Sequence, residues 1–112
     1  MFKLAPTSDG HWKEEIICGF RNPANGFYPS SGLILDKAGN LYGATAQGGA
    51  GTCYNGCGVV YELSPGANGK WTYGVLHEFI GNSGSLPPGN LVLDEKGNLY
   101  GTAYGAVYEI TP

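Results

Sequence analysis

The sequence predicts an all-β fold of antiparallel four-stranded sheets that repeat along the chain, as β-propeller blades do. Three observations lead to this prediction. Of the 112 residues, 20 are Gly and 8 are Tyr, and only 13% are charged, which is typical of short strands joined by tight turns. No window has an apolar period of 3.6 residues long enough to predict a helix. Similar segments recur about 58 residues apart.

Three pairs of segments align without a gap and together span most of the chain. The aligned pairs are 2–20 with 61–79, 29–43 with 87–101, and 58–65 with 105–112. The second copy lacks the string QGGAGTCYNGC, which the first copy carries between its second and third strand-like runs. A repeat of this length fits a propeller blade better than a turn of a solenoid.

Each repeat contains four runs with the composition of strands. These runs are 33–36 and 91–94, then 40–45 and 98–103, then 59–63 with 1–4 before it and 106–110 after it, and finally 71–79 and 12–20. The first run is apolar up to its final Asp, which predicts a strand buried on both faces. In the run 71–79, large apolar residues alternate with small or polar ones, the pattern of a half-exposed strand.

The order of these runs predicts about two blades plus one strand. Residues 1–20 would form the last two strands of a first blade, 33–79 a complete blade, and 91–112 the first three strands of a further blade. A propeller needs roughly four to eight blades to close. We therefore expect that the chain is part of a longer protein or that copies of it assemble into a closed propeller. Open blades leave strand edges that invite pairing with other chains.

The string Asp-x-x-Gly-Asn ends the first run in both copies and predicts a tight turn. Asp36 and Asp94 can accept hydrogen bonds from backbone N–H groups, the following Gly supplies a positive φ, and Asn40 and Asn98 open the next strand. We therefore predict that these four residues are structural turn caps. The alternative is a catalytic or metal-binding loop that the protein uses twice.

The cysteines predict one small disulfide. Cys53 and Cys57 bracket three residues in the inserted loop, and a bond between them would stabilise the fold by about 2 kcal/mol in the chain-entropy model. It would also fit an oxidising, extracytoplasmic compartment. The alternatives are two reduced thiols or a metal site, although a structural zinc needs four ligands. Cys18 lies in a strand and is expected to be a buried, inert thiol.

Three aromatic residues form the candidate ligand surface. Tyr54 lies between two of the cysteines, and Trp12 and Trp71 recur at aligned positions, each just after a Gly-containing turn. An exposed Trp could stack on a sugar ring, and the alternative is that each Trp anchors the last strand of its blade. The Gly-rich run 47–51 does not lead from a strand into a helix, so it predicts a flexible loop and not a phosphate cradle.

Charge and composition exclude several classes of partner. The net charge is −3, and the six Lys and Arg residues are scattered, which argues against nucleic acid and anionic membrane surfaces. No apolar run approaches the roughly 18 residues of a membrane span. No group of residues completes a catalytic site; His77 and Glu78, for example, adjoin in a strand and so point to opposite faces. We expect no catalytic residues, no bound metal and no cofactor.

At these residues the chain resembles the tandem repeat of the GloVer-containing choice-of-anchor proteins. That repeat carries a D-x-x-G-N-L-Y-G-T-T string, a Gly-Gly loop, a G-T-V-F-x-L strand and an L-Y-S-F-like strand; this chain has LDKAGNLYGATAQGG, CGVVYELSP and VLHEF in the same order. The resemblance implies an extracytoplasmic protein with a β-propeller-like fold, often tethered by a C-terminal sorting signal. It implies no established chemistry. The segments IICGF and VLHEF depart from the usual L-Y-S-F.

Function follows from these observations only as an expectation. We expect a non-catalytic extracytoplasmic repeat module for binding or scaffolding, with a glycan or a surface polymer as a possible ligand. The alternative is a partial propeller enzyme, lactonase-like or lyase-like, whose site is assembled from several blades, with Asp36 and Asp94 as candidates for metal contacts. A purely structural spacer is a third hypothesis.

Overall fold

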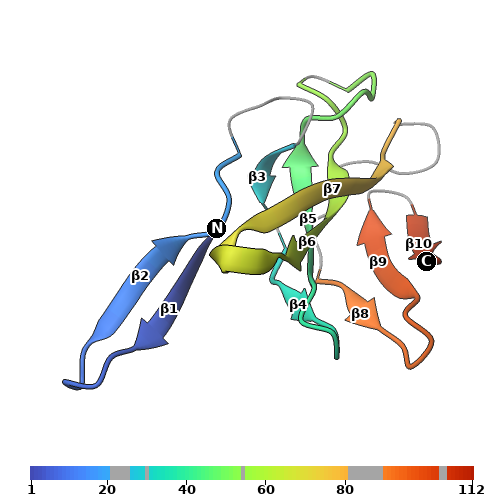
Figure 1. Cartoon of the computed structure of the whole chain (residues 1–112). Helices are drawn as coiled ribbons and strands as arrows, with labels where there is room; N and C mark the ends of the chain where they lie inside the picture. The colour runs from blue at the N-terminus through green and yellow to red at the C-terminus, as the bar shows by residue number, and fades with distance from the viewer. Residues whose placement is uncertain (21–25, 30, 54, 81–89, 104–105) are drawn as a thin grey trace.

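The prediction of an all-β, antiparallel fold is confirmed. The computed structural model describes residues 1–20, 26–29, 31–53, 55–80, 90–103 and 106–112. In this part of the chain ten β-strands form antiparallel sheets, and the helical structure is a single 3₁₀ turn, Ala67–Gly69 (Figure 1). Among these residues no helix has the length and apolar character that crossing a bilayer would require.

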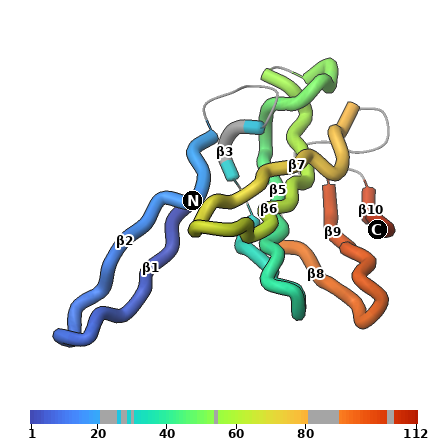
Figure 2. The backbone as a smooth tube through the Cα atoms, in the orientation of Figure 1, coloured from blue at the N-terminus to red at the C-terminus, as the bar shows by residue number. Residues whose placement is uncertain are grey.

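An N-terminal hairpin forms the first sheet. Strand β1 (Phe2–Pro6) pairs with β2 (Trp12–Ile16), with Phe2 opposite Ile16 and Pro6 opposite Trp12. The turn between them is closed by the backbone N–H of Thr7, which donates to the carbonyl of His11 at 2.7 Å. Figures 1 and 2 show this hairpin projecting away from the other strands.

The central sheet is an antiparallel meander with one additional strand. Strands β4 (Ile34–Leu35), β5 (Leu41–Gln47), β6 (Val59–Pro65) and β7 (Trp71–Glu78) pair in chain order. Strand β3 (Phe27–Pro29) pairs with the later part of β5, on the same edge as β4. The central sheet therefore contains the four strands that the runs between 33 and 79 predict.

The C-terminal sheet has strands β8 (Val92–Leu93), β9 (Leu99–Ala103) and β10 (Ala106–Ile110) in the order β10-β9-β8. Its register matches that of the central sheet at aligned positions. Strand β4 pairs residues 34 and 35 with 42 and 41, and β8 pairs 92 and 93 with 100 and 99. The similar sequences therefore form hairpins with the same pairing.

Both faces of the central sheet are covered. Val60 belongs to a core shared with buried residues of the C-terminal sheet, such as Leu91 and Leu99. Its neighbours in β6, Tyr61 and Leu63, point to the opposite face and pack in a second core, against residues that precede the sheet and residues of β5 and β7. Strand β6 is thus largely buried on both sides, by the C-terminal sheet on one and mainly by residues outside the strands on the other.

The same aromatic contact joins successive sheets twice. Phe20, which follows the N-terminal hairpin, lies 5.2 Å from Tyr61 of the central sheet, measured between ring centroids. Phe79, which follows β7, lies 5.1 Å from Tyr108 of the C-terminal sheet. Both pairs are inclined, with interplanar angles of 58° and 68°, an arrangement that aromatic rings favour.

The prediction that the first strand of each repeat is buried on both faces is wrong. Strands β4 and β8 have only two residues each, and the side chains of Leu35 and Val92 are more than half exposed. Leu33 is also exposed. Ile34 and Leu93 do pack against the core. An apolar run shows that a strand can be covered on both faces, but a neighbouring sheet must be present to cover it.

The alternation predicted for 71–79 holds only for the first part of the strand. Trp71, Tyr73 and Val75 are half-buried, with exposed residues between them. The register then shifts: Tyr61 pairs with Val75 and Val60 pairs with His77, which leaves residue 76 as a bulge. A β-bulge changes which side chains face the core.

Candidate functional site

The first Asp turn uses both oxygens of its carboxylate. Oδ1 of Asp36 accepts hydrogen bonds from the backbone N–H groups of Ala38 and Asn40, each at 2.9 Å. Oδ2 accepts from the Asn40 side-chain amide and from the Tyr42 hydroxyl, also at 2.9 Å. Gly39 follows with a φ of 90° and donates to the Asp36 carbonyl, a conformation that favours glycine.

The second Asp turn repeats this network. Asp94 accepts from the backbone of Lys96 and Asn98, from the Asn98 side chain and from the Tyr100 hydroxyl, at 2.8–2.9 Å. These bonds, those from Asn98 first, lower the pKa of Asp94 to about 2. Removal from water alone would raise the pKa of Asp36, but its hydrogen bonds outweigh that effect and lower the pKa.

These networks place all four predicted turn caps inside turns. The sequence analysis did not identify the two tyrosines as partners of the carboxylates. A signal for them exists, because Tyr42 and Tyr100 each stand six residues after the Asp in both copies. Each carboxylate bound in this way accepts four hydrogen bonds, about as many as its lone pairs can hold. The turns therefore have little capacity left to coordinate a metal.

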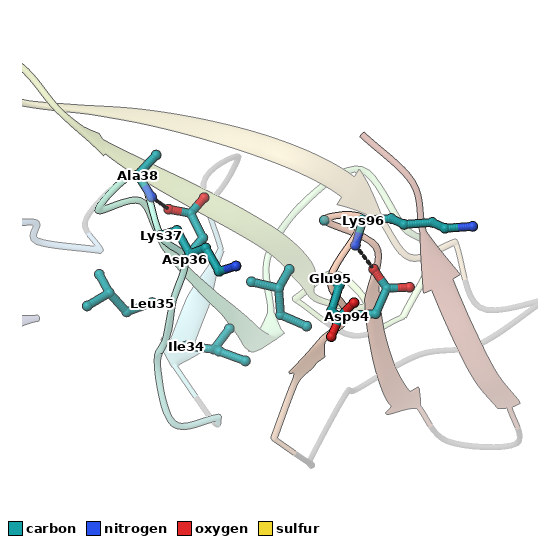
Figure 3. Close-up of a pocket in the computed structure, with 10 residues that line it drawn as sticks. Ile34, Leu35, Asp36, Lys37, Ala38, Asp94, Glu95 and Lys96 are labelled. Carbon is teal, nitrogen blue, oxygen red and sulfur yellow. Dashed lines mark hydrogen bonds between the residues drawn. The ribbon is translucent and has the colours of Figure 1, made fainter.

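A hollow of about 550 Å³ lies between the two turns (Figure 3). Aligned segments line it from both sheets: 34–38 on one side and 93–97 on the other. Ile34 and Leu93 are the half-buried apolar side chains of the lining, and both pack against the core. Lys37, Glu95 and Lys96 bring charges of both signs. The lining of the hollow is therefore both apolar and charged.

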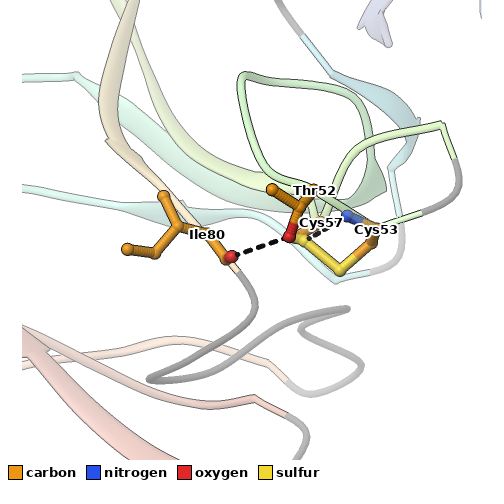
Figure 4. The surroundings of a disulfide bond; sticks show 4 residues. All are labelled: Thr52, Cys53, Cys57 and Ile80. Atoms are coloured by element: carbon orange, nitrogen blue, oxygen red, sulfur yellow. Dashed lines mark hydrogen bonds between the residues drawn. A yellow bond between two sulfur atoms is a disulfide. The ribbon is translucent and has the colours of Figure 1, made fainter.

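The predicted disulfide between Cys53 and Cys57 is confirmed (Figure 4). The Cα atoms lie 5.0 Å apart, and Cys57 is completely buried in the core that joins the central and C-terminal sheets. The hydroxyl of Thr52 donates to the carbonyl of Ile80 at 3.3 Å, which ties the loop to the end of β7. The disulfide thus anchors the loop in the core.

Residues 47–51, predicted to be a flexible loop, make backbone hydrogen bonds within the disulfide loop. The backbone N–H of Gly48 donates to Asn55 at 2.6 Å, and the carbonyl of Gly48 accepts from Gly58 at 3.0 Å. A Cβ on Gly51 would lie 2.7 Å from the sulfur of Cys57. Glycine therefore serves here to let the backbone approach the disulfide closely.

The hollow and the disulfide loop lie at opposite ends of the central sheet. Strand β5 runs from the first Asp turn to the disulfide loop and has seven residues, which corresponds to roughly 20 Å. Figure 1 shows the turn and the loop at the two ends of this strand. A single small ligand cannot bridge the two.

The structure describes two of the three residues of the candidate ligand surface. Tyr54 lies outside the described residues. Trp12 begins β2 and is 65% exposed, whereas Trp71 begins β7 and packs against the core around Tyr61 and Leu63. Of the two that are described, Trp12 is therefore the one that presents an open ring.

The remaining candidate groups form no site in the described part of the chain. Cys18 is half-buried, and burial raises the pKa of its thiol, which disfavours the reactive thiolate. Within the described ranges no three His, Cys, Asp or Glu side chains lie close enough together to hold a metal ion.

Comparison with known proteins identifies no relative. No protein-family model matches the sequence, and searches of curated proteins and of solved structures find no significant match. The resemblance to the GloVer-containing repeat therefore stays a prediction that depends on sequence motifs.

Proposed function

We propose that this chain is a non-catalytic module for binding or scaffolding, built from β-propeller-type blades of the GloVer-containing choice-of-anchor kind. The observation that carries this proposal is the state of the two repeated carboxylates. Asp36 and Asp94 each accept four hydrogen bonds from their own turns. The enzyme hypothesis offers these two carboxylates as candidates for metal contacts, and the turns already use them.

The blade architecture has independent support. The aromatic contacts Phe20–Tyr61 and Phe79–Tyr108 recur at equivalent places along the chain. In each contact an aromatic residue that follows one sheet meets a Tyr on the third predicted strand of the next. Radial repetition of one such contact is what builds a propeller.

The disulfide supports a location outside the cytoplasm. Disulfides persist in oxidising compartments, whereas cytosolic thiols are kept reduced. The Cys53–Cys57 bond closes a short loop whose second cysteine is fully buried. We infer that the protein folds and works in an extracytoplasmic compartment.

The proposed ligand is a glycan or a carbohydrate surface polymer, and Trp12 is the proposed contact. Its ring is largely exposed at the start of β2, and an indole can cover the apolar face of a sugar ring. Net negative charge favours a neutral polymer over an acidic one.

A depletion assay tests the binding function. The protein is incubated with insoluble chitin, cellulose and peptidoglycan, and the unbound fraction is measured over a range of polymer concentrations. We expect at least one polymer to retain the protein, and Trp12→Ala to weaken that retention about tenfold, the loss of one stacking contact. Lys13→Ala, the neighbouring exposed position on β2, is the matched control and should bind as the unmodified protein does.

Metal analysis tests the enzyme hypothesis separately. The purified protein is dialysed against Ca²⁺, Mg²⁺ or Zn²⁺, and the bound metal is quantified by mass spectrometry. We expect no stoichiometric metal in either the unmodified protein or Asp36→Asn. A stoichiometric metal that is lost in Asp36→Asn, with the fold retained in circular dichroism, would overturn the non-catalytic proposal in favour of the enzyme.

A further inference from the structure

Some exposed apolar side chains align with residues that are buried elsewhere in the same chain. Val60 of β6 is 0% exposed, in the core between the central and C-terminal sheets. Val107 of β10 aligns with Val60 but is 79% exposed. Val92 of β8 is also exposed, although the residue with which it aligns, Ile34, packs in that core. We call Val92 and Val107, on the C-terminal sheet, the tail face.

The N-terminal hairpin shows the complementary pattern. Leu4 of β1 is 51% exposed, although it aligns with Leu63 of β6, which is 1% exposed. Phe2 aligns with the buried Tyr61 and is likewise open. Ile16, the register partner of Phe2, lies on the same face and is exposed too. We call Phe2, Leu4 and Ile16 the head face.

The contact between the central and C-terminal sheets shows how these two kinds of face fit together. Val60, the counterpart of a tail residue, shares one core with Tyr108 and Ile110 of β10. Tyr108 and Ile110 align with Phe2 and Leu4, so they are counterparts of head residues. The chain therefore already contains one buried tail-to-head contact of the kind that its two outer faces could form.

We propose that the tail face of one copy of this chain docks on the head face of a second copy, as the central sheet packs on the C-terminal sheet. This inference rests on the scaffolding part of the proposed function and names its partner. A second copy is the occupant because one chain carries both halves of the contact. Since the two faces differ, the contact is heterologous and leaves one face of each kind free, which generates a ring or a filament.

One side chain limits the strength of this contact. Glu14 is the register partner of Leu4, and it stands where the central sheet has Tyr73, which packs against the second core. The head face is therefore less apolar than the face with which it aligns. We expect reversible association over roughly 1–200 µM protein, and not a permanent oligomer.

Two charge substitutions test both faces. Val107→Glu blocks the tail face and Leu4→Glu blocks the head face, and both positions are exposed, so the fold should tolerate them. We expect the mass of the unmodified protein, measured by sedimentation velocity, to rise with concentration. Each variant alone should stay monomeric. An equimolar mixture of the two variants should form 1:1 dimers, because Leu4→Glu keeps an intact tail and Val107→Glu keeps an intact head.

Several outcomes would overturn the inference. These are an unmodified protein that stays monomeric up to 200 µM, a variant that associates alone like the unmodified protein, or a mixture that remains monomeric. Ile80→Glu, at an exposed apolar residue on neither face, is the control and should associate normally. If Leu4→Glu proves unfolded by circular dichroism, Phe2→Glu replaces it.

The binding function is measured independently of assembly. Val107→Glu is monomeric under the inference and keeps Trp12, so its retention on the insoluble polymers reports the ligand contact alone. Retention without self-association would overturn the inference and leave the binding function standing. Self-association without retention on any polymer would overturn the binding function and leave the inference standing.

Discussion

Replacing Gly43 by Ala should destabilise the protein because the ring of Tyr61 occupies the space that a Cβ would need. These residues are register partners in β5 and β6. A Cβ at position 43 would contact the Tyr61 hydroxyl and lie 2.7 Å from Cζ, where ordinary contact begins at 3.4 Å. The ring would have to retreat by roughly 0.7 Å or more.

Tyr61 has little freedom to make that movement. It is almost fully buried, and the rings of Phe20 and Tyr73 lie 5.2 Å and 5.5 Å from it. Forcing an extra methyl into such a core lowers the free energy of unfolding by about 1–3 kcal/mol. Backbone entropy predicts the opposite sign, since Ala in a strand is favoured over Gly by about 0.5–1 kcal/mol. The steric effect should win.

Gly74→Ala is the matched control. Gly74 lies in the adjacent strand β7, and a Cβ there would meet no atom within 4 Å. Without a clash, only the entropy effect remains, so this variant should be as stable as the unmodified protein or more stable by up to about 1 kcal/mol. The two variants make the same chemical change and differ in what surrounds it.

Urea unfolding followed by tryptophan fluorescence measures both variants. At a slope of about 1–2 kcal/mol per molar urea for a chain of this size, the midpoint of Gly43→Ala should fall by about 1 M. In a Tyr61→Leu background the cost of Gly43→Ala should shrink, because the obstructing ring is gone. If Gly43→Ala and Gly74→Ala unfold at the same urea concentration, the steric argument is refuted.

Three further predictions concern the disulfide, the second Asp turn and a buried hydroxyl. Reducing the Cys53–Cys57 bond should lower the free energy of unfolding by about 2 kcal/mol; equal urea midpoints with and without reductant would contradict this. The pKa of Asp94 is depressed to about 2 from 3.8, so its stabilising effect is complete above about pH 5 and disappears as the pH falls towards 2. The urea midpoint should therefore depend less on pH across this range in Asp94→Asn than in the unmodified protein. Among the described residues the buried hydroxyl of Tyr108 has no hydrogen-bond partner, so Tyr108→Phe should be neutral or stabilising in thermal unfolding; a drop in Tm of several degrees would indicate a hidden partner.

Local structure was predictable from the sequence because its causes are local. The Asp turns depend on a carboxylate and the groups within six residues of it, and the disulfide depends on two cysteines four residues apart. Antiparallel pairing of successive strands requires only short connections. These features appear in the sequence as fixed spacings.

Burial was less predictable because it depends on what lies against a strand. Leu33 and Leu91 align and are chemically identical, yet Leu33 is exposed and Leu91 is buried beneath the central sheet. The close approach of Gly51 to Cys57 likewise depends on the position of Cys57 in the core. The sequence of β7 does not by itself predict the bulge at residue 76. The sequence of a strand likewise does not tell which part of the protein packs against each of its faces.

The recurring motif Asp-x-x-Gly-Asn-Leu-Tyr-Gly has a structural explanation that needs no chemistry. Tyr42 and Gly43 are neighbours in β5, so they face opposite sides of the sheet. On one side, Tyr42 packs in the core shared with the C-terminal sheet while its hydroxyl holds Asp36. On the other side, Gly43 leaves room for Tyr61, whose ring contacts that of Phe20, a residue that follows the N-terminal hairpin.

The second copy of the motif repeats the close contact between a glycine and a tyrosine ring. Gly101 stands beneath Tyr108 as Gly43 stands beneath Tyr61, and Phe79 packs on Tyr108. One short string therefore closes a turn and shapes both faces of a sheet for stacking. The central and C-terminal sheets each carry this string once. Its Asp, Asn, Tyr and Gly all have structural partners here.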